Sequence, residues 1–260
     1  MSIFDVPVRD YMSPPIYTVS PDAHLPQVEQ LLLDAGVSGM PVVDGSFRVL
    51  GVISRTDLLQ QDAVPAVTGG TGLRLSLPDR RVADVIRGAP LTVKPDAPLS
   101  DAVELMREQH IHRVLVVDAE RLAGVVTVYD IMRVVARDGV RQKLGTLMSG
   151  SVVTVPPDAP VDASLERLQN AHVHGLVVVE SGWPIGVFGQ EEALAAERWP
   201  QPTTVDQWLN PAVLTMPASM PVHRAAAQAV ATRTRHIVVM ELEGIGGIVT
   251  AADFMNVKED

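Results

Sequence analysis

Apolar and polar positions follow one fixed order along this chain, and that order occurs four times. Each copy opens with a Thr beside an apolar residue, followed by a cluster of Pro, Asp or Ser. Apolar residues at helical spacing come next, and then two short runs rich in Val and Ile. The opening phrases are IYTVSPDAHL (16–25), PLTVKPDAPL (90–99), VVTVPPDAPV (152–161) and VLTMPASMPV (213–222).

Two further phrases follow each opening phrase at a constant distance. The middle phrases are GMPVVD (39–44), RVLVVD (113–118), GLVVVE (175–180) and HIVVME (236–241). The closing phrases are GVISRTD (51–57), GVVTVYD (124–130), GVFGQEE (186–192) and GIVTAAD (247–253). Three phrases that keep their register in four copies indicate an internal repeat.

Each copy predicts the element order β-α-β-β-α. The Thr-apolar piece predicts a short extended segment, and the Pro and Asp or Ser residues after it are a helix-start signal. Helical spacing is seen for Leu25, Val28, Leu31 and Leu32, and for Leu99, Val103 and Met106. The second helix should begin near Thr56, Tyr129, Glu191 and Ala252. We therefore predict an α/β (α+β) fold of four β-α-β-β-α units.

A unit of this size has a marginal core, so we expect the units to stack in pairs. A long stretch, 62–81, joins the first two copies, and its Gly-Gly-Thr-Gly at 69–72 predicts a flexible loop. The expected first module is 1–137, with units 8–62 and 82–137 and linker 63–81. The expected second module is 138–260, with units 143–198 and 205–258.

Composition narrows the class of protein. The 260 residues are 47% apolar and carry a net charge of −10, which argues against nucleic-acid binding. No apolar run approaches the roughly 18 residues of a membrane span, and the acidic start is unlike a signal peptide. The absence of Cys excludes disulfides and thiolate metal sites. We expect a cytoplasmic protein.

The motifs VRDYM (8–12), Thr-Val-Pro-Asp, PVVD and GVISRTDLL (51–59) resemble cystathionine-β-synthase (CBS) domains, in all four copies. The resemblance implies that two units form a Bateman module with clefts for AMP, ADP, ATP, S-adenosylmethionine or related ligands. It implies that two modules form a flat disc, within one chain or between chains. It also implies a regulatory role, with the nucleotide as regulatory ligand and not as catalytic cofactor.

In this family, the ribose and phosphate signature is Gly-apolar-x-Ser/Thr-x-Ser/Thr-Asp. A carboxylate can accept hydrogen bonds from a ribose diol, and a helix N-terminus offers N–H groups to an anion. The first copy keeps the whole signature and the third has lost it. The predicted ligand-binding residues are Thr18, Ser54, Thr56 and Asp57 in copy one, Thr92, His112, Arg113, Thr127 and Asp130 in copy two, and Thr215, Thr250 and Asp253 in copy four.

The resemblance to kinase-regulating relatives implies that the pair His112-Arg113 meets the phosphate of the ligand held by Asp57. The matching pairs are Ser38-Gly39, His174-Gly175 and Arg235-His236. Arg235 lies opposite the degraded third signature, so we assign it no function. The cleft of Asp57 is the best equipped of the four.

Other interpretations stay open. Ser54 and Thr56 could be helix caps, and Asp57 could only complement the helix dipole. The fourfold repeat favours ligand contact for Asp57, whereas the two interpretations are balanced for Asp130 and Asp253. Paired histidines, such as His110 and His112, suggest metal binding, but no carboxylate cluster accompanies them, so we predict no metal site.

We therefore predict a non-catalytic nucleotide sensor that acts on a separate effector protein and forms a homodimer. A structural scaffold and a sensor of S-adenosylmethionine-type ligands are the alternatives. The sequence contains no nucleophile–base constellation and no phosphate loop of the kind that enzymes use.

Overall fold

The computed structural model of this chain describes residues 2–14, 17–61, 64–66, 74–197 and 203–258. Unit 1 contains α1 (Leu25–Asp34), β1 (Gly39–Val43), β2 (Val49–Ser54) and α2 (Arg55–Leu59). Unit 2 contains β5 (Thr92–Val93), α3 (Leu99–Glu108), β6 (Arg113–Asp118), β7 (Arg121–Thr127) and α4 (Val128–Arg137). The order β-α-β-β-α is confirmed in unit 2, and in unit 1 the first strand is reduced to a bridge between Val19 and Val42.

The second half repeats this order. Unit 3 contains β8 (Thr154–Val155), α5 (Val161–Asn170), β9 (Gly175–Glu180), β10 (Trp183–Gly189) and α6 (Gln190–Glu197). Unit 4 contains β11 (Leu214–Pro217), α7 (Val222–Thr232), β12 (His236–Glu241), β13 (Gly244–Thr250) and the 3-10 helix η5 (Ala251–Asn256). The predicted fold class is therefore confirmed, although unit 4 closes with a 3-10 helix and not with an α-helix.

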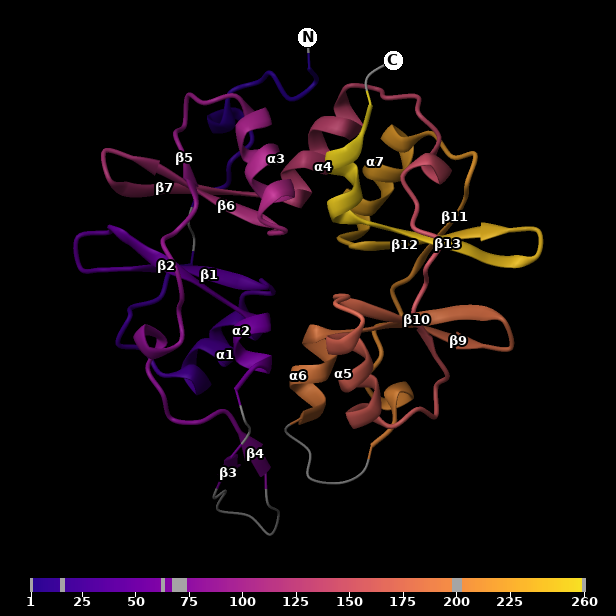
Figure 1. The fold of residues 1–260 in the computed structure, drawn as a ribbon, viewed down its shortest axis with the longest axis horizontal. Coiled ribbons are helices and arrows are strands. Elements are labelled where there is room, and N and C mark those ends of the chain that lie inside the picture. The colour runs from indigo at the N-terminus through magenta and orange to yellow at the C-terminus, as the bar shows by residue number, and fades with distance from the viewer. Residues whose placement is uncertain (1, 15–16, 62–63, 67–73, 198–202, 259–260) are drawn as a thin grey trace.

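The sheets of units 1 and 2 pack against each other, and their helices lie on the outer faces (Figure 1). Within units 2, 3 and 4 the first strand is parallel to the middle strand, and the middle strand is antiparallel to the last. Apolar residues between the two sheets include Val43, Leu115 and Leu122. The four units together surround the centre of a disc (Figure 1).

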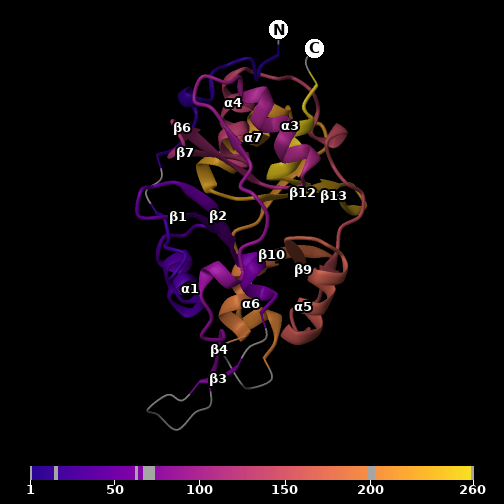
Figure 2. The ribbon, with the colours of Figure 1, turned by 60° about the vertical axis from the view of Figure 1, so that its left-hand side comes forward.

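The stretch that joins units 1 and 2 is not a simple loop. Residues Val64–Ala66 (β3) and Arg74–Ser76 (β4) form an antiparallel hairpin. This hairpin extends away from the body of the disc in both views (Figures 1 and 2). The expectation of a loop throughout is thus wrong for these residues, and the Gly-rich stretch 69–72 lies outside the described residues.

The short segment that precedes each unit packs on the other unit of its pair. The 3-10 helix η1 (Val8–Asp10) lies on unit 2, where Val8 N donates to Ala97 O at 2.9 Å. The 3-10 helix η2 (Val82–Asp84) lies on unit 1, where Val82 N donates to Ala23 O at 2.9 Å. Because both valines are fully buried, each core is completed by a segment that leads into the other unit.

The second pair shows the same exchange. The 3-10 helix η3 (Leu144–Thr146) lies on unit 4, through the bond from Leu144 N to Met220 O at 2.8 Å. The 3-10 helix η4 (Val205–Gln207) lies on unit 3, through the bond from Val205 N to Ala159 O at 3.0 Å. This reciprocity joins unit 1 to unit 2 and unit 3 to unit 4.

The two pairs meet through their helices. Helix α4 of unit 2 contacts α7 and η5 of unit 4, and these elements share one apolar core. Helix α2 of unit 1 contacts α6 of unit 3, where Leu194 packs into the core of unit 1. The disc therefore closes within a single chain.

Candidate functional site

The middle strands of all four units begin at the centre of the disc. Their first residues occupy equivalent positions, because each pairs with the last residue of the neighbouring strand: Gly39 with Ser54, Arg113 with Thr127, Gly175 with Gly189 and His236 with Thr250. We use the name hub for these four residues and the residue before each: Ser38, Gly39, His112, Arg113, His174, Gly175, Arg235 and His236.

A glycine lies opposite a large side chain in each pair. Arg113 extends from unit 2 to unit 1, where its Nη1 donates to Gly39 O at 2.5 Å and its Nη2 donates to Ser38 Oγ at 2.5 Å. A Cβ at position 39 would lie 2.7 Å from Arg113 Nη1. In the second pair, a Cβ at Gly175 would lie 3.0 Å from His236 Cε1. The two glycines therefore leave room for Arg113 and His236.

Arg113 lies where its charge acts on unit 1. Burial, together with the charges of Arg235 and Arg55, lowers its pKa to about 10, and Asp57 opposes this effect. A guanidinium group remains protonated in proteins, so Arg113 presents a buried positive charge within electrostatic reach of Asp57. The sequence predicted this approach of Arg113 to unit 1.

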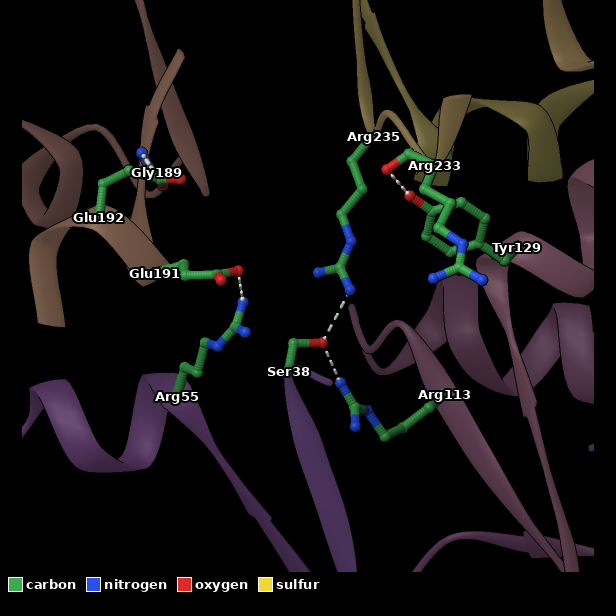
Figure 3. A network of polar contacts seen from close by, with 9 residues as sticks. All are labelled: Ser38, Arg55, Arg113, Tyr129, Gly189, Glu191, Glu192, Arg233 and Arg235. Atoms are coloured by element: carbon green, nitrogen blue, oxygen red, sulfur yellow. Dashed lines mark hydrogen bonds and ion pairs between the residues drawn. The ribbon is translucent and has the colours of Figure 1, made fainter. Parts of the chain in front are cut away.

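Arg235 reaches a different unit from the one that its sequence position suggested. Its Nη2 donates to Ser38 Oγ at 3.1 Å, and its guanidinium carbon lies 5.7 Å from the centre of the Tyr129 ring (Figure 3). Tyr129 donates in turn to Arg233 O at 2.5 Å. Arg235 thus faces unit 1 and unit 2, and it also lowers the pKa of His174 in unit 3, the unit that the sequence placed opposite it.

Arg55 is a site residue that the sequence reasoning missed. Its side chain is only 7% exposed, and its Nη1 lies 2.7 Å from Glu191 Oε2 of unit 3. Its Nε and Nη2 are buried without any hydrogen-bond partner. Burial lowers the pKa of Arg55, and Glu191 opposes this effect. The available signal was a cation between the two hydroxyl positions of the signature, where unit 2 has Val128.

The histidines of the hub are neutral near pH 7. The rings of His112 and His174 meet edge to face at 4.6 Å. Burial, together with neighbouring cations and histidines, lowers the pKa of His112 and that of His236 to about 4. Burial also lowers the pKa of His174. Of the predicted pair His112-Arg113, only Arg113 therefore carries charge.

The acidic residue that ends each closing phrase caps a helix. Asp57 Oδ2 accepts from Ser54 N at 2.8 Å and from Ser54 Oγ at 2.5 Å. Thr127 and Asp130 form the same pair of bonds, as do Thr250 and Asp253. In unit 3, Glu192 Oε2 accepts from Gly189 N at 3.0 Å. Helix capping is thus common to all four copies.

Accessibility distinguishes Asp57 from Asp130. Asp130 is only 4% exposed, burial raises its pKa, and its second oxygen accepts from Arg133 at 3.3 Å. Asp57 is half-buried and lines a narrow cleft with Arg80 and Arg87. Both hydrogen bonds from Ser54 to its carboxylate use Oδ2. Asp57 is therefore the better placed of the two for a ligand.

The remaining predicted residues lie further from this arrangement. Thr56 accepts from Gln190 Nε2 of unit 3 at 3.0 Å, so its hydroxyl joins two helix starts. Thr18 is half-buried, whereas Thr92 and Thr215 are exposed. Thr92 lines a groove with the carboxylates of Asp101, Glu104 and Glu108, which is unsuited to a phosphate. In the described part of the chain, no hydrogen bond joins Thr18, Thr92 or Thr215 to Asp57, Asp130 or Asp253.

Two features of the described residues bear on other classes of protein. Within those residues, no group of three or more His, Asp or Glu side chains is arranged as metal ligands would be. In the same residues, no helix is both long enough and apolar enough to cross a membrane.

Several known proteins resemble this chain in sequence. An uncharacterized 33.4 kDa protein encoded in a ribosomal RNA operon of Thermofilum pendens is 25% identical over 79% of this chain and 68% of its own length. The CBS domain-containing protein CBSX2 of Arabidopsis thaliana is 29% identical over 48% of this chain and 62% of its own length. The match to inosine-5'-monophosphate dehydrogenase of Methanocaldococcus jannaschii covers only 32% of that enzyme.

Two solved structures resemble the whole disc. Protein MJ1225 from Methanocaldococcus jannaschii, described as a candidate archaeal homolog of g-AMPK, superposes with a TM-score of 0.79 at 16% identity, over 96% of this chain and 99% of that one. An uncharacterized conserved protein from Pyrococcus horikoshii gives 0.68 at 22% identity, over 97% and 99%. These likenesses establish the fold of four units.

A family model decides the assignment. The model of the CBS domain matches residues 8–63, 82–137 and 144–198, which together are more than half of the chain. The fourth copy lies outside these matches, although its strands and helix follow the same order. On this evidence the chain belongs to the CBS domain family.

Proposed function

We propose that this protein is a non-catalytic regulator that binds an adenine nucleotide (AMP, ADP or ATP) in its first pair of units and acts on a separate effector protein. Asp57 would bind the ribose and Arg113 the phosphate. The observation that carries the proposal is Arg113, a buried charge that extends from unit 2 into unit 1 within electrostatic reach of Asp57.

The residues present fit such a ligand. The cleft beside Asp57 is lined by Arg80 and Arg87 as well as by Asp84, and the two arginines are the groups there that an anion could contact. Two nitrogen atoms of Arg55 are buried without a hydrogen-bond partner, which is an arrangement that an anionic ligand would complete. In a chain of net charge −10, the gathering of Arg55, Arg113 and Arg235 at the hub favours an anion.

We further propose that the chain forms two Bateman modules, 1–137 and 138–260, and that the fourth copy is a CBS unit. The exchange of the leading segments η1 and η2, and of η3 and η4, supports the pairing. The capping of η5 by Asp253 supports the assignment of unit 4. We propose no ligand for Asp130, which is buried, or for unit 3, where Glu191 and Glu192 replace the hydroxyl and Asp positions.

A purely structural scaffold and a sensor of S-adenosylmethionine are the competing functions. The binding of ligands separates them, because a ligand that binds only the folded state stabilises it by about 2.7 kcal/mol at 100 times its Kd. We expect AMP, ADP or ATP to raise the Tm of the protein. A shift with S-adenosylmethionine alone would favour the second alternative, and no shift with any ligand would favour the scaffold.

Asp57→Asn tests the ribose contact, and Asp253→Asn is its matched control. Both carboxylates cap a helix in the same way, so both substitutions should cost similar stability. Only Asp57→Asn should abolish the ligand-induced rise in Tm. Equal ligand responses of the two variants would contradict the proposed site, and turnover of ATP that Asp57→Asn abolishes would contradict the non-catalytic role.

Homodimerisation is a separate proposal. The disc closes within one chain, so a second chain is not required to complete it. Light scattering of the intact protein tests this proposal, and a monomeric mass would contradict it.

A further inference from the structure

Three arginines from three units converge at the centre of the disc. Arg55 comes from the start of α2, Arg113 from the start of β6 and Arg235 from the residue before β12. Figure 3 shows the guanidinium groups of Arg113 and Arg235 directed toward Ser38 and that of Arg55 directed toward Glu191. Arg235 lowers the pKa of both other arginines, and Arg55 lowers that of Arg113, so the three charges lie within electrostatic reach of one another.

The three guanidinium groups have more hydrogen-bond donors than the surrounding side chains have acceptors. Ser38 Oγ, a neutral hydroxyl, accepts from both Arg113 and Arg235. Among the described residues, the one ion pair of these three arginines joins Arg55 to Glu191, and it leaves Nε and Nη2 of Arg55 buried and without partners. A guanidinium group offers five donors, and a buried donor without an acceptor costs about 1–3 kcal/mol. Apart from Glu191, which pairs with Arg55 alone, the described contacts of the three guanidinium groups include no hydrogen bond to a negatively charged acceptor.

We propose that Arg55, Arg113 and Arg235 together bind a phosphoryl group, and that Glu191 occupies part of its place when no anion is bound. The inference rests on the proposed function and extends it, because it adds ligands from outside the Asp57 cleft and a mechanism of regulation. Phosphate oxygens suit the planar donors of arginine, which bind them in bidentate fashion.

Glu191 is suited to leave when the anion arrives. Its side chain is 48% exposed, whereas that of Arg55 is 7% exposed, so the carboxylate can turn toward solvent while the guanidinium group stays in place. A bound phosphate would also repel Glu191 by its like charge. Glu191 thus acts as an internal competitor of the ligand.

This competition would connect the two pairs of units. Arg55 and Arg113 belong to units 1 and 2, whereas Glu191 and Arg235 belong to units 3 and 4. Binding of a phosphoryl group exchanges the ion pair between α2 and α6 for a contact that Arg235 shares. The ligand thereby changes how one pair contacts the other, which provides an output for the sensor.

Isothermal titration of the intact chain with pyrophosphate, adenosine and ATP tests the proposal. We expect Glu191→Gln to bind pyrophosphate and ATP about three- to tenfold more tightly, because it removes a charged competitor. Glu180→Gln is the matched control: Glu180 is an exposed residue at the far end of β9, and its loss changes the net charge equally. We expect the control to bind with unchanged affinity.

Substitution of Arg235 or Arg55 tests whether these side chains bind the phosphoryl group. Arg235→Ala replaces an exposed side chain and should weaken pyrophosphate and ATP binding about tenfold or more, with adenosine binding unchanged. Arg55→Lys keeps one charge in the buried position and should also reduce the ratio of ATP affinity to adenosine affinity. A gain for Glu191→Gln no larger than for Glu180→Gln, or wild-type binding by Arg235→Ala, would overturn the proposal.

The two proposals fail in different ways. If ATP binding depends on Asp57 but not on Arg55, Arg235 or Glu191, the nucleotide function stands and the shared phosphoryl site does not. If pyrophosphate binds with the expected effects but no adenosine compound binds at Asp57, the phosphoryl site stands and the nucleotide function does not. Absence of binding by both pyrophosphate and ATP would reject both.

Discussion

At the level of single residues, the pairing of a glycine with a large side chain organises the hub. Gly39 has no Cβ, so its carbonyl is open to Arg113. An added Cβ would lie 2.9 Å from Ile53 O. The two atoms nearest to that added Cβ, Arg113 Nη1 and Ile53 O, are polar atoms held in place, and the β1–β2 ladder holds Ile53 O. The identity of residue 39 therefore controls where Arg113 lies.

Gly39→Ala should destabilise the protein by about 1–3 kcal/mol, because overpacking forces a shift of buried atoms. It should also weaken nucleotide binding, since Arg113 must move. Gly45→Ala is the control, because nothing lies within 4 Å of an added Cβ there. Urea denaturation measures the loss, and equal stability of the two variants would contradict this account of Gly39.

The lowered pKa of His236 predicts that the protein loses stability in mild acid. Its pKa in the folded protein is about 4, below the ordinary value of 6.5, because of burial. Between these values the unfolded chain binds more protons than the folded one, so the free energy of unfolding falls as the pH is lowered from about 6.5 toward 4. His236 should contribute on the order of 2 kcal/mol to this fall.

The comparison of the wild type with His236→Gln measures that contribution. Denaturant titrations at pH 7 and pH 5 should show a smaller difference for the variant than for the wild type. The remaining dependence should come largely from His112 and His174, whose pKa values are also lowered by burial. An unchanged difference would show that His236 does not titrate in this range.

Residue types alone predicted part of the site. The sequence pointed to Asp57 and Arg113, because both stand at fixed positions of the repeat. It did not point to Arg55, because the meaning of a cation between Ser54 and Thr56 depends on Glu191 of a distant unit. It gave Arg235 no function for the same reason: the partner of a long side chain is decided by tertiary packing.

At the level of elements, the sequence predicted most of the architecture. Helix spacing located α1 and α3, and residues such as Leu25, Leu99 and Met106 are fully buried. Leu31, however, is 42% exposed, because it lies outside the face of α1 that packs on the sheet. The 3-10 form of η5 was also not predicted, since Ala251–Asn256 carries the same start signal as the α-helices.

The start of α4 is tied to unit 4 by Tyr129. Its hydroxyl donates to the backbone carbonyl of Arg233, and Arg233 ends α7 in a left-handed conformation (φ 53°). Tyr129→Phe should therefore destabilise the protein by about 1 kcal/mol, the net value of one hydrogen bond. Tyr17→Phe is the control, because Tyr17 is 44% exposed. Thermal unfolding measures both, and an equal effect would contradict the role of this bond.

At the level of the whole molecule, the repeat predicted pairs of units but not the exchange of their leading segments. Each segment, such as η1, is short and contributes one buried Val or Leu, so its own sequence does not identify the unit that it covers. Closure of the disc within one chain was also open. It depends on α4, whose buried residues serve the core of unit 2 and the contact with α7 at the same time.

This shared core predicts the behaviour of residues 138–260 as a separate protein. Without α4, the apolar core that α7 and η5 share with it would be partly exposed, and this core includes Ala226, Ala229 and Phe254, which are almost fully buried in the intact chain. An apolar surface of this kind drives association. We therefore expect the fragment to form a dimer in which α7 and η5 of one copy cover those of the other, in place of the missing unit 2.

Light scattering of the fragment across a concentration series measures this association. Ala229→Glu should prevent this association, because burial of an unpaired charge in the new interface is costly. The control is Ala227→Glu, an exposed position on the same helix, which should leave the dimer intact. A monomeric fragment with a cooperative unfolding transition would contradict this expectation, because it would show that the second pair of units folds without its contact with α4.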